Sequence, residues 1–161
     1  MAMTAYMKVT GNTQGPINGD CPQKGRENTV LVYELDHIVE IPRDTHTGLP
    51  TGQRIHKPLR ITTHFGMHSP KFCQACCSGE QVQVEIDFYW ITDKGQEQHY
   101  FTIKLTNAII VEERMWYPYT FLEENKPYHH MQDVTFTYEK IVWTYEVTGI
   151  EGEDDWKAPK A

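Results

Sequence analysis

The chain has 161 residues, of which 39% are hydrophobic and 23% are charged, and its formal net charge is −7 at pH 7. This length predicts one domain over residues 1–161, and the composition is that of a globular protein rather than a disordered one. The negative balance argues against nucleic acid as a partner, because phosphate binding needs a basic face. No apolar stretch approaches the ~18 residues of a membrane span, and residues 1–10 lack signal-peptide features. We therefore expect neither membrane insertion nor export by the general pathway.

Apolar and polar residues alternate along most of the chain, which is the pattern of half-buried β-strands. The alternation predicts strands over residues 31–41, 55–65, 82–90, 99–105, 134–138 and 141–147. Pro58 favours an edge position or a bulge in the second of these strands. Asp93-Lys94-Gly95 has turn chemistry and predicts a hairpin between the third and fourth. The last two strands have opposite phases, so we expect a bulge or sharp bend near Glu139 and Lys140.

One segment has the signals of a short helix. Ser69 is a plausible N-cap, Pro70 suits the first helical position, and Gly79 is a natural C-terminal stop. Helical spacing places Phe72 on one stripe with three cysteines, Cys73, Cys76 and Cys77. We expect these cysteines to be buried, reduced and free of metal, which fits folding in a reducing cytoplasm.

Three long irregular segments remain, residues 11–28, 42–53 and 115–132. The second separates two strongly alternating strands, and loops of this length are often functional. The third is aromatic but is accompanied by glutamates, so protein contact or loop anchoring is favoured over base stacking. Residues 148–161 form a C-terminal acidic tail. Because no crossover helices match the strands, we predict an all-β, mainly antiparallel fold: a β-barrel of two sheets with one short flanking α-helix and a long extended loop.

Few residues are candidates for chemistry. His64, His68, Cys73 and Cys76 are residue types that bind zinc, but their spacing matches no standard zinc module, and buried cysteine behaves as a small apolar side chain. The Cys73 and Cys76 pair is a weaker redox candidate, since Cys73 lies past the free N–H groups of the first helical turn. His37 is expected to be a satisfied core residue, and no known catalytic motif accompanies the histidines. We predict no catalytic residue, cofactor, metal site or enzymatic activity.

Several segments together resemble the Hcp family, the haemolysin-coregulated proteins. The resemblance covers nearly the whole chain and is specific in the order and spacing of its parts. These parts are Tyr6-Met7-Lys8 with Gly11, Gln14-Gly15 and Ile17; His37-Ile38-Val39 with Pro42; the continuous run from Thr47-Gly48-Leu49-Pro50 through Gln53-Arg54-Ile55-His56 to Leu59; Ser69-Pro70 with Ala75 and Gly79-Glu80; and Tyr138 and Ile141 through Asp154-Asp155-Trp156.

The resemblance implies a structural protein of the bacterial type VI secretion system. Members of the family form hexameric rings that stack into the inner tube, carry effector proteins in the lumen, meet the sheath and spike, and are secreted through the apparatus after cytoplasmic synthesis and assembly. No appended toxin domain is expected. We further expect the long loop to lie against a neighbouring protomer, through Pro42, Thr47, Gly48, Leu49, Pro50, Thr51, Gly52, Gln53 and Arg54.

Two alternatives stay open at the level of sequence. A ligand-binding barrel of the lipocalin type would be a monomer with a closed apolar cavity. A metal-binding β-barrel enzyme is the less favoured alternative, because no His-x-His pair followed by a glutamate occurs on a predicted strand.

Overall fold

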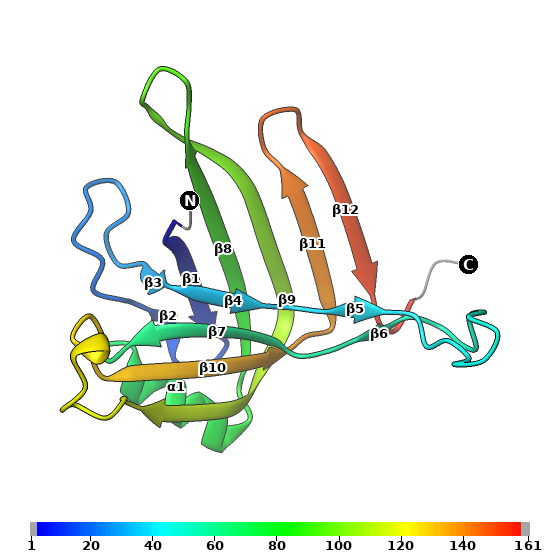
Figure 1. Cartoon of the computed structure of the whole chain (residues 1–161), viewed down its shortest axis with the longest axis horizontal. Coiled ribbons are helices and arrows are strands. Elements are labelled where there is room, and N and C mark those ends of the chain that lie inside the picture. The colour runs from blue at the N-terminus through cyan, green and yellow to red at the C-terminus, as the bar shows by residue number, and fades with distance from the viewer. Residues whose placement is uncertain (1–2, 159–161) are drawn as a thin grey trace.

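The computed structural model describes residues 3–158 and is mainly antiparallel β-structure with one short α-helix, as the sequence predicts (Figure 1). Its strands are β1 (Ala5–Gly11), β2 (Gly15–Ile17), β3 (Val30–Val32), β4 (Glu34–Asp36), β5 (Val39–Glu40), β6 (Ile55–His56), β7 (Leu59–His64), β8 (Gln81–Ile91), β9 (Glu97–Trp116), β10 (Met131–Thr137), β11 (Lys140–Tyr145) and β12 (Ile150–Asp155). Helix α1 spans Ser69–Ser78, and a short 3-10 helix, η1, spans Glu123–Asn125. No helix in the described range has both the length and the apolar character to cross a membrane.

Strand β9 is the centre of the main sheet. Within residues 3–158, ten strands join in this sheet, and β2, β1, β8, β9, β10, β7 and β4 are neighbours in that order. The first part of β9 pairs with β8 on one side and β11 on the other, whereas its last part pairs with β10. Asn107 has a φ of 50° at a register shift between β8 and β9, and such a bulge bends a strand. Within residues 3–158 the strands thus form two sheets, the ten-stranded main sheet and the small β5–β6 pair.

The predicted strand over residues 31–41 is divided into β3, β4 and β5. Val30 and Val32 are buried, but Tyr33 is 46% exposed and the chain bends there. Before the bend β3 pairs with β1, and after it β4 pairs with β7, so this segment links the two ends of the strand order. The expectation of one continuous strand is wrong, because the first part of this alternating segment pairs with β1 and the next part pairs with β7.

The predicted strand over residues 55–65 is also divided, because Pro58 lies between β6, which pairs with β5, and β7, which pairs with β10 and β4. Strands β1 and β12 were not predicted, whereas the predictions over 82–90, 99–105, 134–138 and 141–147 correspond to β8, β9, β10 and β11. A hairpin joins β8 and β9, with the backbone N–H of Thr92 donating to the carbonyl of Gln96 at 2.8 Å. The bend expected near Glu139 and Lys140 is confirmed, since β10 ends at Thr137 and β11 begins at Lys140. Because the chain bends there, Phe136 and Ile141, which have opposite phases, are both fully buried in the same core.

Helix α1 begins and ends close to the predicted residues but is rotated from the predicted orientation. Its N-cap is His68 rather than Ser69, and Gly79 ends the helix with a φ of 68°. Phe72 and Ala75 are fully buried, whereas Cys73 and Cys76 are only half-buried and Cys77 is exposed. The expectation that all three cysteines are buried is therefore wrong. The large Phe72 side chain fixes the buried face, and at about 100° per residue Cys77 points some 140° away from it.

A polar network lies beneath the helix. The Ser69 hydroxyl donates to Gln132 Oε1 at 2.8 Å, and Gln132 Nε2 donates to Glu113 Oε2 at 2.6 Å. The other oxygen of Glu113 is buried and accepts no hydrogen bond. Burial raises the pKa of Glu113 to about 7, because an ionised carboxylate loses its hydration there. Burial, followed by the nearby Glu113, also raises the pKa of Cys73 and Cys76, so both thiols stay protonated beside it.

This network predicts a pH dependence of stability. The folded-state pKa of Glu113 lies above its ordinary value, so the folded protein binds more protons than the unfolded chain between about pH 4.5 and 7. The contribution of protonated Glu113 to the free energy of unfolding is present at the acidic end of this window. It is lost as the pH rises through the folded-state pKa. We expect Glu113→Gln to be more stable than the natural protein at pH 8, with the difference shrinking towards pH 5.

Urea denaturation at a series of pH values measures this difference. Glu112→Gln is the matched control, because Glu112 is the exposed neighbour on the same strand. Parallel pH profiles for the natural protein and Glu113→Gln would show that the buried carboxyl does not titrate in this range.

Candidate functional site

A two-stranded arm projects from the body of the molecule (Figure 1). The arm comprises residues 38–57 and contains β5 and β6, whose register pairs Val39 with His56 and Glu40 with Ile55. The backbone N–H of Lys57 donates to the carbonyl of Ile38 at 2.9 Å and closes the base of the arm. All nine residues of the predicted interface loop lie on this arm.

The tip of the arm is ordered by its own hydrogen bonds. The Asp44 carboxylate accepts from the backbone N–H groups of Thr47 at 2.9 Å and His46 at 2.7 Å, and these bonds lower the pKa of Asp44. The N–H of Gly48, which has a φ of 73°, donates to the Asp44 carbonyl at 2.9 Å. The N–H of Thr51 donates to the Pro42 carbonyl at 2.8 Å. The loop thus presents a defined surface without a partner.

The surface of the arm includes several exposed apolar side chains. Of the nine predicted residues, Pro42 and Arg54 are half-buried, and the exposed ones are Thr47, Gly48, Leu49, Pro50, Thr51, Gly52 and Gln53. Leu49 is 65% exposed, and the arm also exposes Ile38, Val39, Ile41 and Ile55. Adjacent exposed apolar side chains of this kind mark interaction sites. The alternating pattern predicts that Val39 and Ile41 lie on a half-buried face, but both side chains are exposed. Ile38, which breaks the polar face of the pattern, is the sequence feature that indicates apolar side chains on both faces of this segment.

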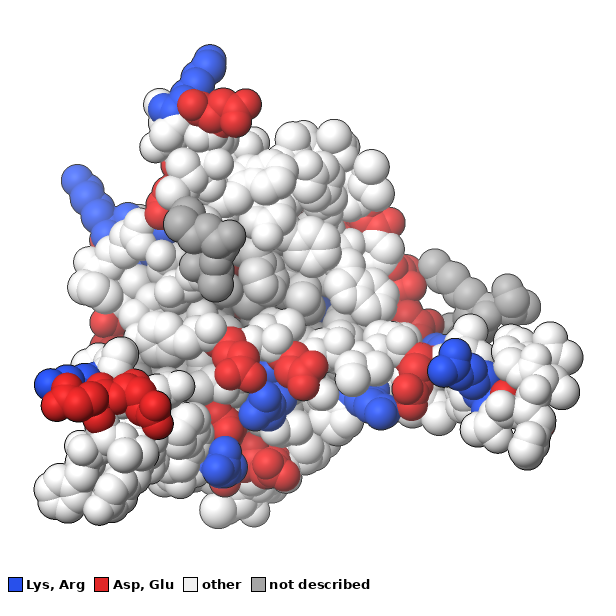
Figure 2. Space-filling view, in the orientation of Figure 1, with Lys and Arg blue, Asp and Glu red and all other residues white. Residues whose placement is uncertain are grey.

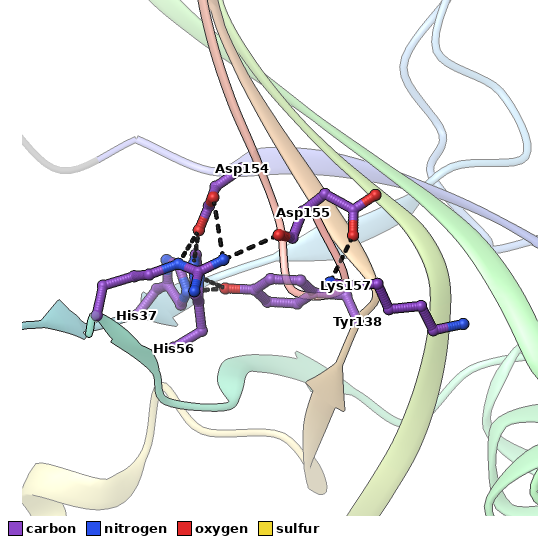
Figure 3. Close-up of polar contacts among 7 residues, drawn as sticks. His37, His56, Tyr138, Asp154, Asp155 and Lys157 are labelled. Atoms are coloured by element: carbon purple, nitrogen blue, oxygen red, sulfur yellow. Dashed lines mark hydrogen bonds and ion pairs between the residues drawn. The ribbon is translucent and has the colours of Figure 1, made fainter. Parts of the chain in front are cut away.

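Arg54 fixes the arm to the last strand. Its guanidinium donates to Asp154 through Nε to Oδ2 at 2.8 Å and through Nη2 to Oδ1 at 3.3 Å, and Nη2 also donates to the Asp155 carbonyl at 2.8 Å (Figure 3). Such two-point pairing restricts orientation as well as distance. Arg54, followed by His56, lowers the pKa of Asp154, so this carboxylate stays ionised. The predicted acidic tail therefore contains β12, and Asp154 on this strand forms an ion pair with Arg54 of the arm.

A chain of hydrogen bonds continues from Asp154 into the core (Figure 3). His56 Nε2 lies 2.5 Å from Asp154 Oδ2, and the Tyr138 hydroxyl lies 2.7 Å from both His56 Nδ1 and His37 Nε2. Because a carboxylate only accepts, His56 Nε2 donates to Asp154, and the Tyr138 hydroxyl links the rings of His56 and His37. Burial raises the pKa of Tyr138 and lowers the pKa of His37, which keeps both side chains neutral. His37 is half-buried and hydrogen-bonded.

The geometry of this network supports anchoring rather than chemistry. The cavity beside it has a volume of about 40 Å³, far below the ~300 Å³ of a small-molecule site. The ring of His56 also packs between Trp143, at 6.5 Å, and Trp156, at 5.1 Å between centroids. The sequence did not identify Asp154, His56 and Tyr138 as partners, because they lie 82 and 98 residues apart along the chain.

The residues of the zinc hypothesis lie in different environments. His64 Nε2 is 3.1 Å from both carboxylate oxygens of Asp20, and its Nδ1 is 2.9 Å from the Tyr33 hydroxyl. His68 Nε2 lies 3.1 Å from the His64 carbonyl oxygen, while Cys73 and Cys76 lie on α1. Across residues 3–158, no group of three or more His, Cys, Asp or Glu side chains is placed to hold a metal ion.

Comparisons with known proteins agree on one family. The family model described as "Type VI secretion system effector, Hcp" matches residues 6–145. The "Major exported protein" of Pseudomonas aeruginosa is 43% identical over 171 aligned residues, which include 100% of this chain and 99% of that protein.

Solved structures give the same result. The Hcp1 protein from the E. coli EAEC 042 pathovar superposes with a TM-score of 0.84 at 32% identity, covering 96% of this chain and 99% of the other. The secreted protein Hcp3 from Pseudomonas aeruginosa has a TM-score of 0.76 at 38% identity, covering 94% and 99%. The matched family model spans β1 to β11, and the relatives extend over the arm and the last strand. The chain therefore belongs to the Hcp family of type VI secretion system proteins.

Proposed function

We propose that the protein forms hexameric rings that stack into the inner tube of a type VI secretion apparatus and carry effector proteins in the lumen. The observation that carries the proposal is the arm, which is ordered, exposes apolar side chains and is fixed to β12 by Arg54. Preorganised surfaces of this kind lose little entropy on binding, which favours assembly. Partners would be further copies of the chain, effectors, and the sheath and spike of the apparatus.

Family membership also bears on export and on chemistry. The Hcp family is structural rather than enzymatic. Two relatives are named as exported or secreted proteins. We propose that this chain is likewise assembled in the cytoplasm and leaves through the apparatus itself rather than by a signal-peptide route.

The arm supplies a first test of assembly. Deleting residues 47–51 removes the exposed tip, and Arg54→Ala removes the two-point contact with Asp154, so both changes should shift the mass from hexamer towards monomer. Lys57→Ala is the matched control, because Lys57 lies on the same arm in an exposed pair with Glu40, and such pairs contribute little. Light scattering coupled to size-exclusion chromatography measures the mass, and circular dichroism checks that the β-structure is retained. Unchanged hexamers in both variants would remove the arm from the interface.

Stacking supplies a second test. Rings of chains that each carry a net charge of −7 repel one another, and added salt screens this repulsion. Light scattering should therefore rise with ionic strength and protein concentration, while negative-stain microscopy shows rings at every salt concentration. A protein that stayed monomeric throughout and retained a small hydrophobic ligand would instead be a ligand-binding barrel of the lipocalin type.

A further inference from the structure

A pocket opens at the end of the molecule opposite the arm. It has a volume of about 660 Å³ and lies between the end of β7 and residues 117–130, which connect β9 to β10 and are called the aromatic loop below. Figure 1 shows this loop, with η1, at one end of the longest axis and the arm at the other. The walls include Tyr33, Phe65, Tyr117, Tyr128 and His130. A pocket with so many aromatic walls suits an apolar segment.

The pocket is preformed. The backbone N–H of Phe65 donates to the His130 carbonyl at 3.0 Å, which joins one end of the aromatic loop to the end of β7. Within the loop, Asn125 Nδ2 donates to the Tyr119 carbonyl at 2.8 Å, and the Tyr117 and His130 rings pack at 4.8 Å. The walls therefore hold their places in the single protomer.

The aromatic loop, part of which lines the pocket, exposes large aromatic side chains in the single protomer. Tyr117 is 60% exposed, Tyr119 is 64% exposed and Phe121 is 85% exposed. Aromatic side chains are enriched at the centres of protein interfaces and depleted elsewhere on surfaces. The aromatic loop is thus a second candidate interface, and the proposed function of the arm does not account for it.

The arm tip carries the kinds of side chain that an aromatic-lined pocket can receive. The arm tip carries exposed Leu49 and Pro50, and aromatic-lined grooves are typical binding sites for proline-containing segments. In addition, the tip is narrow, because it is the turn of a two-stranded hairpin closed by the Arg43–Pro50 bridge.

Charge complementarity favours the same pairing. In the arm, Arg54 pairs with Asp154 and Lys57 with Glu40, so Arg43 is the arm cation left without an ion pair among the described residues. In the aromatic loop, Lys126 pairs with Glu123, which leaves Glu124. In Figure 2, acidic side chains lie beside a basic one at the left end of this face, and basic side chains lie beside acidic ones on the lobe that projects at the right. Among the described residues, neither Arg43 nor Glu124 has an ion-pair partner within its own protomer.

We propose that the arm tip of one protomer inserts between the aromatic side chains of this pocket on a second copy of the chain. The inference rests on the proposed assembly and names the surface that receives the arm. Because donor and receptor lie at opposite ends of the molecule, the contact is head-to-tail, and each protomer keeps a free arm or a free pocket until a ring closes or a stack grows.

Cysteine cross-linking tests the contact directly. Thr51→Cys on the arm and Thr120→Cys on the pocket rim are both exposed positions, and the exposed native Cys77 is first replaced by serine. Under mild oxidation the double variant should give a ladder of covalent oligomers in denaturing gels, and each single variant should give at most dimers. The matched control combines Thr51→Cys with Asp93→Cys, which lies in the exposed turn between β8 and β9. This control should give no ladder.

A charge reversal provides an independent measurement. Arg43→Glu and Glu124→Arg should each raise the protein concentration at half-assembly by about fivefold, which corresponds to a coupling of ~1 kcal/mol, and the double reversal should restore it. Rings that form normally, without the Thr51–Thr120 ladder and without restoration, would overturn the pocket as receptor while leaving assembly intact. A protein that forms no ring in any variant, including the natural one, would overturn the proposed function as well.

Discussion

The Asp154 carboxylate is the contact on which the arrangement of the arm depends. It accepts hydrogen bonds from Arg54 and His56, which lie at the base of the arm, while its own strand pairs with β11. The arm has only two short strands of its own, and an isolated hairpin of this size is marginally stable in water. Attachment to β12 therefore converts a weak hairpin into a projection of fixed direction.

The order of the arm bears on the entropy cost of the contact proposed for it. A flexible loop would lose conformational entropy on docking, at a cost of ~1–2 kcal/mol for each backbone residue that becomes ordered. In this protein the Asp44 carboxylate and the backbone bonds around Gly48 order the tip before any partner is present. Ordering the tip therefore adds little to the entropy cost of the proposed contact.

The sequence predicted local features well and long-range contacts poorly. The hairpin around Gly95, the bend near Glu139 and the helix end at Gly79 follow from turn chemistry and alternation, which act within a few residues. Alternation cannot tell which strand lies alongside another, so it missed the change of partner at Tyr33. It also read the region around Asp154 as an acidic tail, because a carboxylate that binds an arginine 100 residues away looks the same in sequence as a solvated one. The cysteines show the same limit, since the rotation of a short helix depends on the sheet beneath it.

The distance between Arg54 and Asp154 along the chain has a consequence for biosynthesis. The arm emerges from the ribosome long before Asp154, which follows Arg54 by 100 residues. A nascent chain therefore displays an apolar hairpin whose direction is not yet fixed, and its arm is held in place only once β12 has been synthesised and has paired with β11. Synthesis of β12 thus determines when the direction of the arm becomes fixed, and chains truncated before β12 lack this anchor.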